Sequence, residues 1–147
     1  MRILVVTVEE KCPTVYTLWA EGYHPEIVVI DPEDIYAYGR TMAEYWSDGE
    51  GFINIEHDMA PWQGAVEALH ACALTDSLCL FGYPRAAQGS LGMTRFTKEL
   101  IQRFPTVNER WPKTPWNMLE SAVLGKFKHV AKHQHRPNIA HMSGWFS

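Results

Sequence analysis

The chain has 147 residues, with 13 basic and 17 acidic side chains and a formal net charge of −4. This negative balance argues against a protein that coats nucleic acid through a generally basic surface. Hydrophobic residues make up 46% and charged residues 20% of the sequence, which is typical of a globular protein and excludes an intrinsically disordered one. A chain of this length is expected to form a single domain over residues 1–147.

The cysteines and the apolar runs indicate the cellular environment. Cys12, Cys72 and Cys79 are odd in number and form no C-x-x-C pair, so we expect a reducing, cytoplasmic compartment. The apolar run at residues 3–8 is followed by acids and is too short for a signal peptide. No apolar run approaches the roughly 18 residues of a membrane span, so no membrane-spanning segment is expected.

The first 31 residues predict a strand, a helix and a second strand. Residues 3–8 are β-branched and apolar on both faces, which is typical of a buried parallel strand. Pro13 suits the first turn of a helix, and Gly22 ends it. Residues 26–30 form the next β-branched run, and a right-handed crossover predicts that the two strands pair in parallel.

The rest of the chain continues to alternate helices and strands. Asp31, Pro32 and Glu33 predict a helix start, because a capping side chain, an early proline and an acid in the first turn all favour one. This alternation predicts an α/β fold: a single three-layer domain with a mainly parallel central sheet. The predicted segments are a helix to residue 46, a strand at 52–58, a helix at 61–72, a strand at 77–81, and helices at 94–104 and 115–124.

An acidic pair stands at the end of the predicted strand 52–58. The period of two in a strand puts Glu56 and Asp58 on one face and turns His57 away. Two carboxylates at this range repel, and unless one of them takes up a proton, a bound divalent cation is the simplest way to relieve the repulsion. The carboxyl ends of strands are also where open α/β sheets bind ligands. In the alternative interpretation Asp58 caps the helix near Pro61 while Glu56 points to solvent.

At this point the sequence resembles a known family. Residues 12–19 and 21–31 read CPTVYTLW and EGYHPEIVVID, and the Glu56-x-Asp58 pair follows them. Together they resemble the opening of the GT-A-type glycosyltransferases of the nucleotide-diphospho-sugar transferase superfamily, in which a D-x-D motif binds metal. The resemblance implies a GT-A-like fold that is unusually short, either a minimal enzyme of viral type or a fold that binds without catalysis.

The resemblance also implies a nucleotide-sugar donor. Asp31 would lie near the base or ribose, with capping of a helix as the alternative role. Arg85 and Arg95 are candidates for contact with donor or acceptor, and otherwise are surface charges. The donor-binding residues that the resemblance implies are Thr7, Val8 and Glu9 at the end of the first strand, Asp31 after the second, and Arg85 in the loop after the fourth.

A metal and a base complete the implied site. Asp58, with or without Glu56, would hold the cation, and His141 would supply a late ligand. Oxygen ligands suit Mn²⁺ or Mg²⁺ better than zinc. Glu120 in the segment WNMLE resembles the family's acid at a helix start and would serve as the base. The alternative for Glu120 is a favourable acid near a helix N-terminus.

The basic, histidine-rich tail leaves further alternatives open. His129 and His133 have the spacing of zinc ligands on a helix, but the surrounding lysines favour contact with phosphate or a polyanionic acceptor. The functional hypothesis is therefore a glycosyltransferase whose hydroxyl acceptor is a modified DNA base, a glycan or a small molecule. The alternatives are a non-catalytic nucleotide- or polyanion-binding module and a metal-dependent hydrolase.

Overall fold

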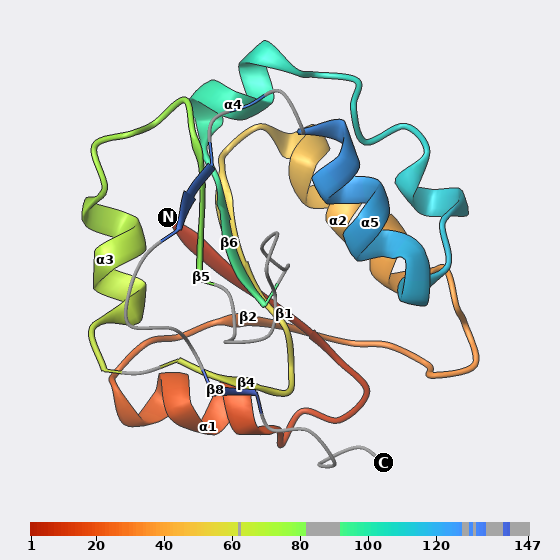
Figure 1. Ribbon diagram of the computed structural model, residues 1–147. Coiled ribbons are helices and arrows are strands. Elements are labelled where there is room, and N and C mark those ends of the chain that lie inside the picture. The colour runs from red at the N-terminus through yellow and green to blue at the C-terminus, as the bar shows by residue number, and fades with distance from the viewer. Residues whose placement is uncertain (62, 82–91, 128–129, 131, 135–139, 142–147) are drawn as a thin grey trace.

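A computed structural model describes the chain except residues 62, 82–91, 128–129, 131, 135–139 and 142–147 (Figure 1). Within the described part, no helix has the length and apolar character needed to cross a bilayer. The elements are, in chain order, β1 (Arg2–Thr7), α1 (Pro13–Ala20), β2 (Glu26–Val29), α2 (Ala37–Asp48), β3 (Phe52–Ile55), β4 (Met59–Ala60), α3 (Ala65–Ala71), β5 (Leu78–Phe81), β6 (Met93–Phe96), α4 (Lys98–Arg103), the 3₁₀ helix η1 (Trp111–Lys113), α5 (Trp116–Lys126), β7 (Lys132–Gln134) and β8 (Ala140–His141).

A mixed sheet of order β2-β1-β3-β6-β5-β7 forms the centre of the fold. β1 pairs in parallel with β2 and β3, and β5 pairs in parallel with β7. β6 lies between β3 and β5 and is antiparallel to both. The expectation of an α/β fold with a mainly parallel sheet is confirmed, as is the parallel pairing of the first two strands.

Helices cover both faces of this sheet because its strands are apolar on both sides. Leu4 and Val6 of β1 pack with residues of α2, α4 and α5 in one core. Ile3 and Val5 point the other way and pack with residues of α1 and α3 in a second core. Figure 1 shows α2 and α5 side by side on one side of the sheet, with α1 and α3 on the other.

The predicted helix at residues 94–104 is wrong in its first part. The segment forms the strand β6, and α4 begins only after Thr97, whose Oγ1 accepts a hydrogen bond from the Leu100 N–H at 3.0 Å. Thr97 is therefore a helix cap that separates the two elements. Arg95 in the middle of β6 hides the strand pattern, although its side chain is buried.

The predicted helix start at Asp31 is also wrong. Asp31 Oδ1 accepts a hydrogen bond from the Glu33 N–H at 2.9 Å, and the chain makes turns until α2 begins at Ala37. An aspartate can use its side chain either to cap a helix or to close a turn two residues ahead. Here the turn is formed, and Asp31 stays exposed at the end of β2.

Candidate functional site

The carboxyl ends of three adjacent parallel strands frame a pocket. β1 lies between β2 and β3, and the chain leaves β1 through α1 but reaches β3 through α2, on the opposite face. Open α/β sheets bind ligands at such a switch point. The pocket has a volume of about 420 Å³ and is lined by Val6, Thr7, Val8, Ile30, Asp31, Pro32, Asp34, Tyr38, Glu56, His57, Asp58, Trp116, Asn117, Leu119 and Glu120.

Most of the residues singled out from the sequence meet in this pocket. Parallel strands bring their carboxyl ends to one edge, which explains why residues from β1, β2 and β3 converge. Glu9 lies apart from this lining and is exposed. Arg85 and the His141 side chain lie outside the described residues, as do His129 and the His133 side chain. The predicted residues that line the pocket are Thr7, Val8, Asp31, Glu56, Asp58 and Glu120.

The acidic pair stands in a turn and not in a strand. β3 ends at Ile55, and the Met59 N–H donates to the Glu56 carbonyl at 3.2 Å. Thr14, in the first turn of α1, braces the turn: its Oγ1 accepts from the Met59 N–H at 3.1 Å and contacts the carbonyl of Glu56. The Glu56 N–H donates a hydrogen bond to the Gly92 carbonyl at 3.0 Å. Backbone contacts on both sides therefore fix the acidic turn at the pocket.

Two expectations about this segment are corrected by the turn. His57 does not turn away from the pair: it lines the pocket, and its Nδ1 lies 3.2 Å from Thr7 Oγ1. Burial lowers the pKa of His57, which favours the neutral imidazole. Asp58 does not cap the following helix, because α3 begins at Ala65 with Gly64 at its cap position.

The carboxylates in the pocket influence one another. Burial, with the negative charges of Glu120 and Asp58 as smaller causes, raises the pKa of Glu56 to about 8. Burial and the same three acids also raise the pKa of Tyr38. Like charges held this close favour a proton or a cation between them. The pocket therefore gathers negative charge, which a proton on Glu56 or a bound cation would neutralise.

Tyr38 is a pocket residue that the sequence did not reveal. It lies in α2, and its hydroxyl accepts a hydrogen bond from Asn54 Nδ2 at 2.8 Å. Asn54 is buried in β3, two residues before Glu56. Because both partners are inside elements with no recognisable motif, no sequence signal pointed to them.

The first part of α5 forms another part of the pocket wall. The Trp116 N–H donates to the Ile35 carbonyl at 2.8 Å, which ties the start of α5 to the loop before α2. Gly39 of α2 lets η1 approach closely, since a Cβ at this position would lie 2.0 Å from the Trp111 carbonyl oxygen. Together these contacts place Glu120 at the pocket.

Glu56 and Asp58 fit a hard divalent cation, because carboxylate oxygens are its preferred ligands. Among the residues that the structure describes, no three His, Cys, Asp or Glu side chains are grouped to hold a metal ion. Further ligands would therefore come from a bound substrate or from residues outside this set. β8 pairs with β4 so that the backbone of His141 lies opposite Met59, next to Asp58 in the chain.

Arg95 does not belong to this pocket. Its buried guanidinium donates to the carbonyls of Leu69 at 2.6 Å and of Cys72 and Leu74 at 2.9 Å. It therefore holds the segment between α3 and β5, and the interpretation as a surface charge or a substrate contact is wrong.

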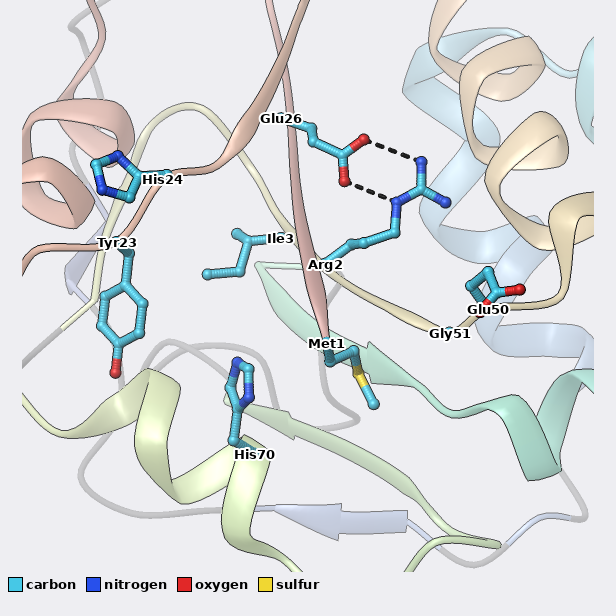
Figure 2. Close-up of a pocket in the computed structure, with 9 residues that line it drawn as sticks. All are labelled: Met1, Arg2, Ile3, Tyr23, His24, Glu26, Glu50, Gly51 and His70. Carbon is cyan, nitrogen blue, oxygen red and sulfur yellow. Dashed lines mark hydrogen bonds and ion pairs between the residues drawn. The ribbon is translucent and has the colours of Figure 1, made fainter.

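A larger hollow of about 620 Å³ lies at the other end of β1 (Figure 2). Its charged groups bind each other: Arg2 pairs with Glu26 through two hydrogen bonds of 2.7 and 2.9 Å, and also with Asp48. Figure 2 shows Tyr23 and His70 on its other side. Because Arg2 already has its acidic partners, this hollow lacks the clustered like charges that mark the smaller pocket.

The fold has a solved counterpart. The crystal structure of a glycosyltransferase involved in the glycosylation of the major capsid of PBCV-1 aligns with 98% of this chain and 96% of its own, with a TM-score of 0.56 and 14% sequence identity. The fold of this chain is glycosyltransferase-like. No protein-family model and no curated protein matches the sequence.

Proposed function

We propose that this chain is a minimal, three-layer GT-A-like glycosyltransferase, which moves a sugar from a nucleotide-sugar donor to a hydroxyl acceptor with Mn²⁺ or Mg²⁺. One observation carries the proposal: Glu56, Asp58 and Glu120 line one pocket at the carboxyl ends of β1, β2 and β3. The similarity of the whole fold to a glycosyltransferase supports the choice of reaction.

The donor side of the site is formed by the strand ends. Thr7 at the end of β1, Val8 directly after it and Asp31 after β2 would contact the nucleoside, because they line the same pocket as the acidic turn. Glu56 and Asp58 would hold the cation at the diphosphate. When bound, the cation neutralises negative charge that develops on the leaving diphosphate.

Glu120 is the proposed base. In a direct displacement, the acceptor oxygen bonds to the anomeric carbon while the bond from that carbon to the phosphate oxygen breaks. The nucleoside diphosphate leaves with the electron pair, and the Glu120 carboxylate takes the proton of the acceptor hydroxyl. Its place on α5, in the same pocket as the acidic turn but on a different element, supports this assignment because the acceptor then lies near both the base and the donor.

The metal-dependent donor site is tested by binding. Thermal unfolding is measured with a panel of nucleoside diphosphates, each with and without Mn²⁺; ligand at about 100 times Kd stabilises by roughly 2.7 kcal/mol. We expect one nucleotide to stabilise the protein only with Mn²⁺, and Asp58→Asn to lose this effect. Asp76→Asn is the matched control, since Asp76 is exposed and outside the pocket lining.

Equal Mn²⁺-dependent binding in the Asp58→Asn variant would refute the metal site. If binding is intact but the protein transfers no sugar and does not hydrolyse the donor, the non-catalytic nucleotide-binding module is the correct alternative. The two outcomes are measured separately, by thermal shift and by release of nucleoside diphosphate.

A further inference from the structure

Trp116 is an exposed tryptophan beside an acidic pocket. It is 59% exposed, whereas Trp46 and Trp111 are almost fully buried in the core. Trp116 nevertheless lines the pocket, and its backbone is fixed at the first position of α5 by the hydrogen bond to Ile35. An indole ring on a fixed backbone position and open to solvent offers a surface for stacking.

The position of Trp116 relative to Glu120 gives this surface a function. The two residues are four positions apart in α5, so both lie on one face of the helix, about 5–6 Å apart at their Cβ atoms. Both line the same pocket. A ring stacked on Trp116 therefore lies beside the proposed base, where the hydroxyl that attacks the donor must be.

The charge of the pocket restricts what this ring can be. Its lining includes the acids Asp31, Glu56, Asp58 and Glu120, and no lysine or arginine among the described residues. Asp34 also lines it and is paired with Arg40, which lies outside the lining. With Glu56 and Asp58 occupied by the cation of the donor, Asp31 and Glu120 remain as negative charges in the lining and disfavour a polyanion such as DNA as the acceptor. A molecule with several uncharged hydroxyls is favoured instead, because carboxylates accept hydrogen bonds from hydroxyl donors.

We infer that the acceptor is an uncharged saccharide whose ring stacks on Trp116 and directs a hydroxyl to Glu120. This inference rests on the proposed function. A sugar ring offers an apolar face of C–H groups to the indole and hydroxyls around its edge. The Asn117 amide, also in the lining, adds a group that both donates and accepts hydrogen bonds. Of the acceptors considered from the sequence, a glycan fits these features and a DNA base does not.

Binding of the acceptor is measured without turnover. The probes are methyl glycosides of glucose, galactose, mannose and fucose, a sialylated glycoside and a short DNA duplex, each followed by ligand-observed NMR. We expect at least one neutral glycoside to bind, with its C–H protons nearest the protein, and the two anionic probes not to bind. Trp116→Ala should weaken binding of the neutral glycoside about tenfold, whereas Trp116→Phe should keep most of the affinity.

Met118→Ala is the matched control. Met118 lies in the same helix and is also 59% exposed, but it is outside the pocket lining. This variant should bind the glycoside like the wild type. In transfer assays Trp116→Ala should raise KM for the acceptor and leave KM for the donor unchanged.

The inference and the proposed function fail in different ways. If the wild-type protein binds no nucleotide in a Mn²⁺-dependent way, the proposed function is refuted, whether or not the glycosides bind. With nucleotide binding intact, the inference is overturned if no neutral glycoside binds, if DNA or the sialylated probe binds better, or if Trp116→Ala and Met118→Ala bind alike.

Discussion

Glu56, in the turn after β3, and Glu120, in the second turn of α5, line one pocket, and the charge of Glu120 helps to raise the pKa of Glu56 to about 8. An unfolded glutamate has a pKa of about 4.3. Between about pH 4.3 and pH 8 the folded protein therefore keeps a proton on Glu56 that the unfolded chain has released. The two carboxylates therefore link folding stability, ligand binding and pH at one site.

The contribution of Glu56 to the stability of the metal-free protein should fall as pH rises. Between about pH 4 and pH 8 the native state binds the proton of Glu56 more strongly than the unfolded state does. The free energy of unfolding from this group therefore decreases with pH, by at most about 1.4 kcal/mol per pH unit, and becomes constant above pH 8. Urea unfolding in EDTA at several pH values measures this slope.

Glu56→Gln provides the comparison for that slope. The amide cannot ionise, so the variant should gain stability relative to the wild type as pH rises from 5 to 8. Taking the difference between the two proteins removes the titration of groups that do not interact with Glu56. Parallel pH profiles for wild type and variant would show that Glu56 has the same pKa in the folded and unfolded states, and would contradict the raised pKa in the pocket.

Glu120→Gln should lower the rate of sugar transfer without weakening binding of the donor. The amide keeps the shape of the side chain but cannot take the acceptor proton, so we expect kcat to fall on the order of 10²-fold or more. Nucleotide binding with Mn²⁺ should change little. Glu99→Gln in α4 is the control, because Glu99 is exposed and outside the pocket lining. A variant as active as this control would exclude Glu120 as the base.

The sequence predicted the strand ends of this site and, through the family resemblance, Glu120 in α5, but it missed Tyr38 in α2. Thr7, Asp31 and Glu56 could be placed together because β-branched runs mark parallel strands, and parallel strands end at one sheet edge. Tyr38 could not, because its position depends on how α2 crosses the sheet and contacts η1. That crossing is set by tertiary packing at Gly39, which the local pattern of α2 does not encode.

Two errors have a common physical cause. The sequence pattern assigned residues 94–104 to a helix, yet Met93–Phe96 form β6, in which Arg95 is buried because three backbone carbonyls accept its hydrogen bonds. It also extended β3 through Asp58, although Thr14 of α1 holds the chain in a turn after Ile55. In both cases a contact between segments distant in sequence outweighs the local preference.

Gly39→Ala should destabilise the fold and disturb the pocket. The added methyl would lie 2.0 Å from the Trp111 carbonyl oxygen, so α2 and η1 must separate. We expect a loss of about 1–3 kcal/mol in the free energy of unfolding, together with weaker nucleotide binding, because η1 leads into α5. Gly125→Ala is the control: it lies in α5 with no atom within 4 Å of the new Cβ, and should stabilise by about 0.5–1 kcal/mol. Similar urea midpoints for the two variants would contradict the close approach of α2 and η1.

Arg95→Met should destabilise the fold because it leaves buried carbonyls without their donor. Arg95 is 2% exposed, and its guanidinium binds the carbonyls of Leu69, Cys72 and Leu74 in the segment between α3 and β5. Methionine fills much of the volume but supplies no hydrogen bond, so we expect a loss of about 3 kcal/mol in the free energy of unfolding, measured in urea. Arg40→Met is the matched control.

The control separates burial from charge. Arg40 is exposed and pairs with Asp34 at the surface, where solvent screening leaves an ion pair little effect on stability. Its loss should therefore shift the urea midpoint far less than the loss of Arg95. Arg95→Met protein that remains folded at low temperature should still bind nucleotide with Mn²⁺, because Arg95 is outside the pocket lining. Equal stability of the two variants would mean that the three carbonyls find other donors, and that Arg95 is dispensable for the packing of α3 against β5.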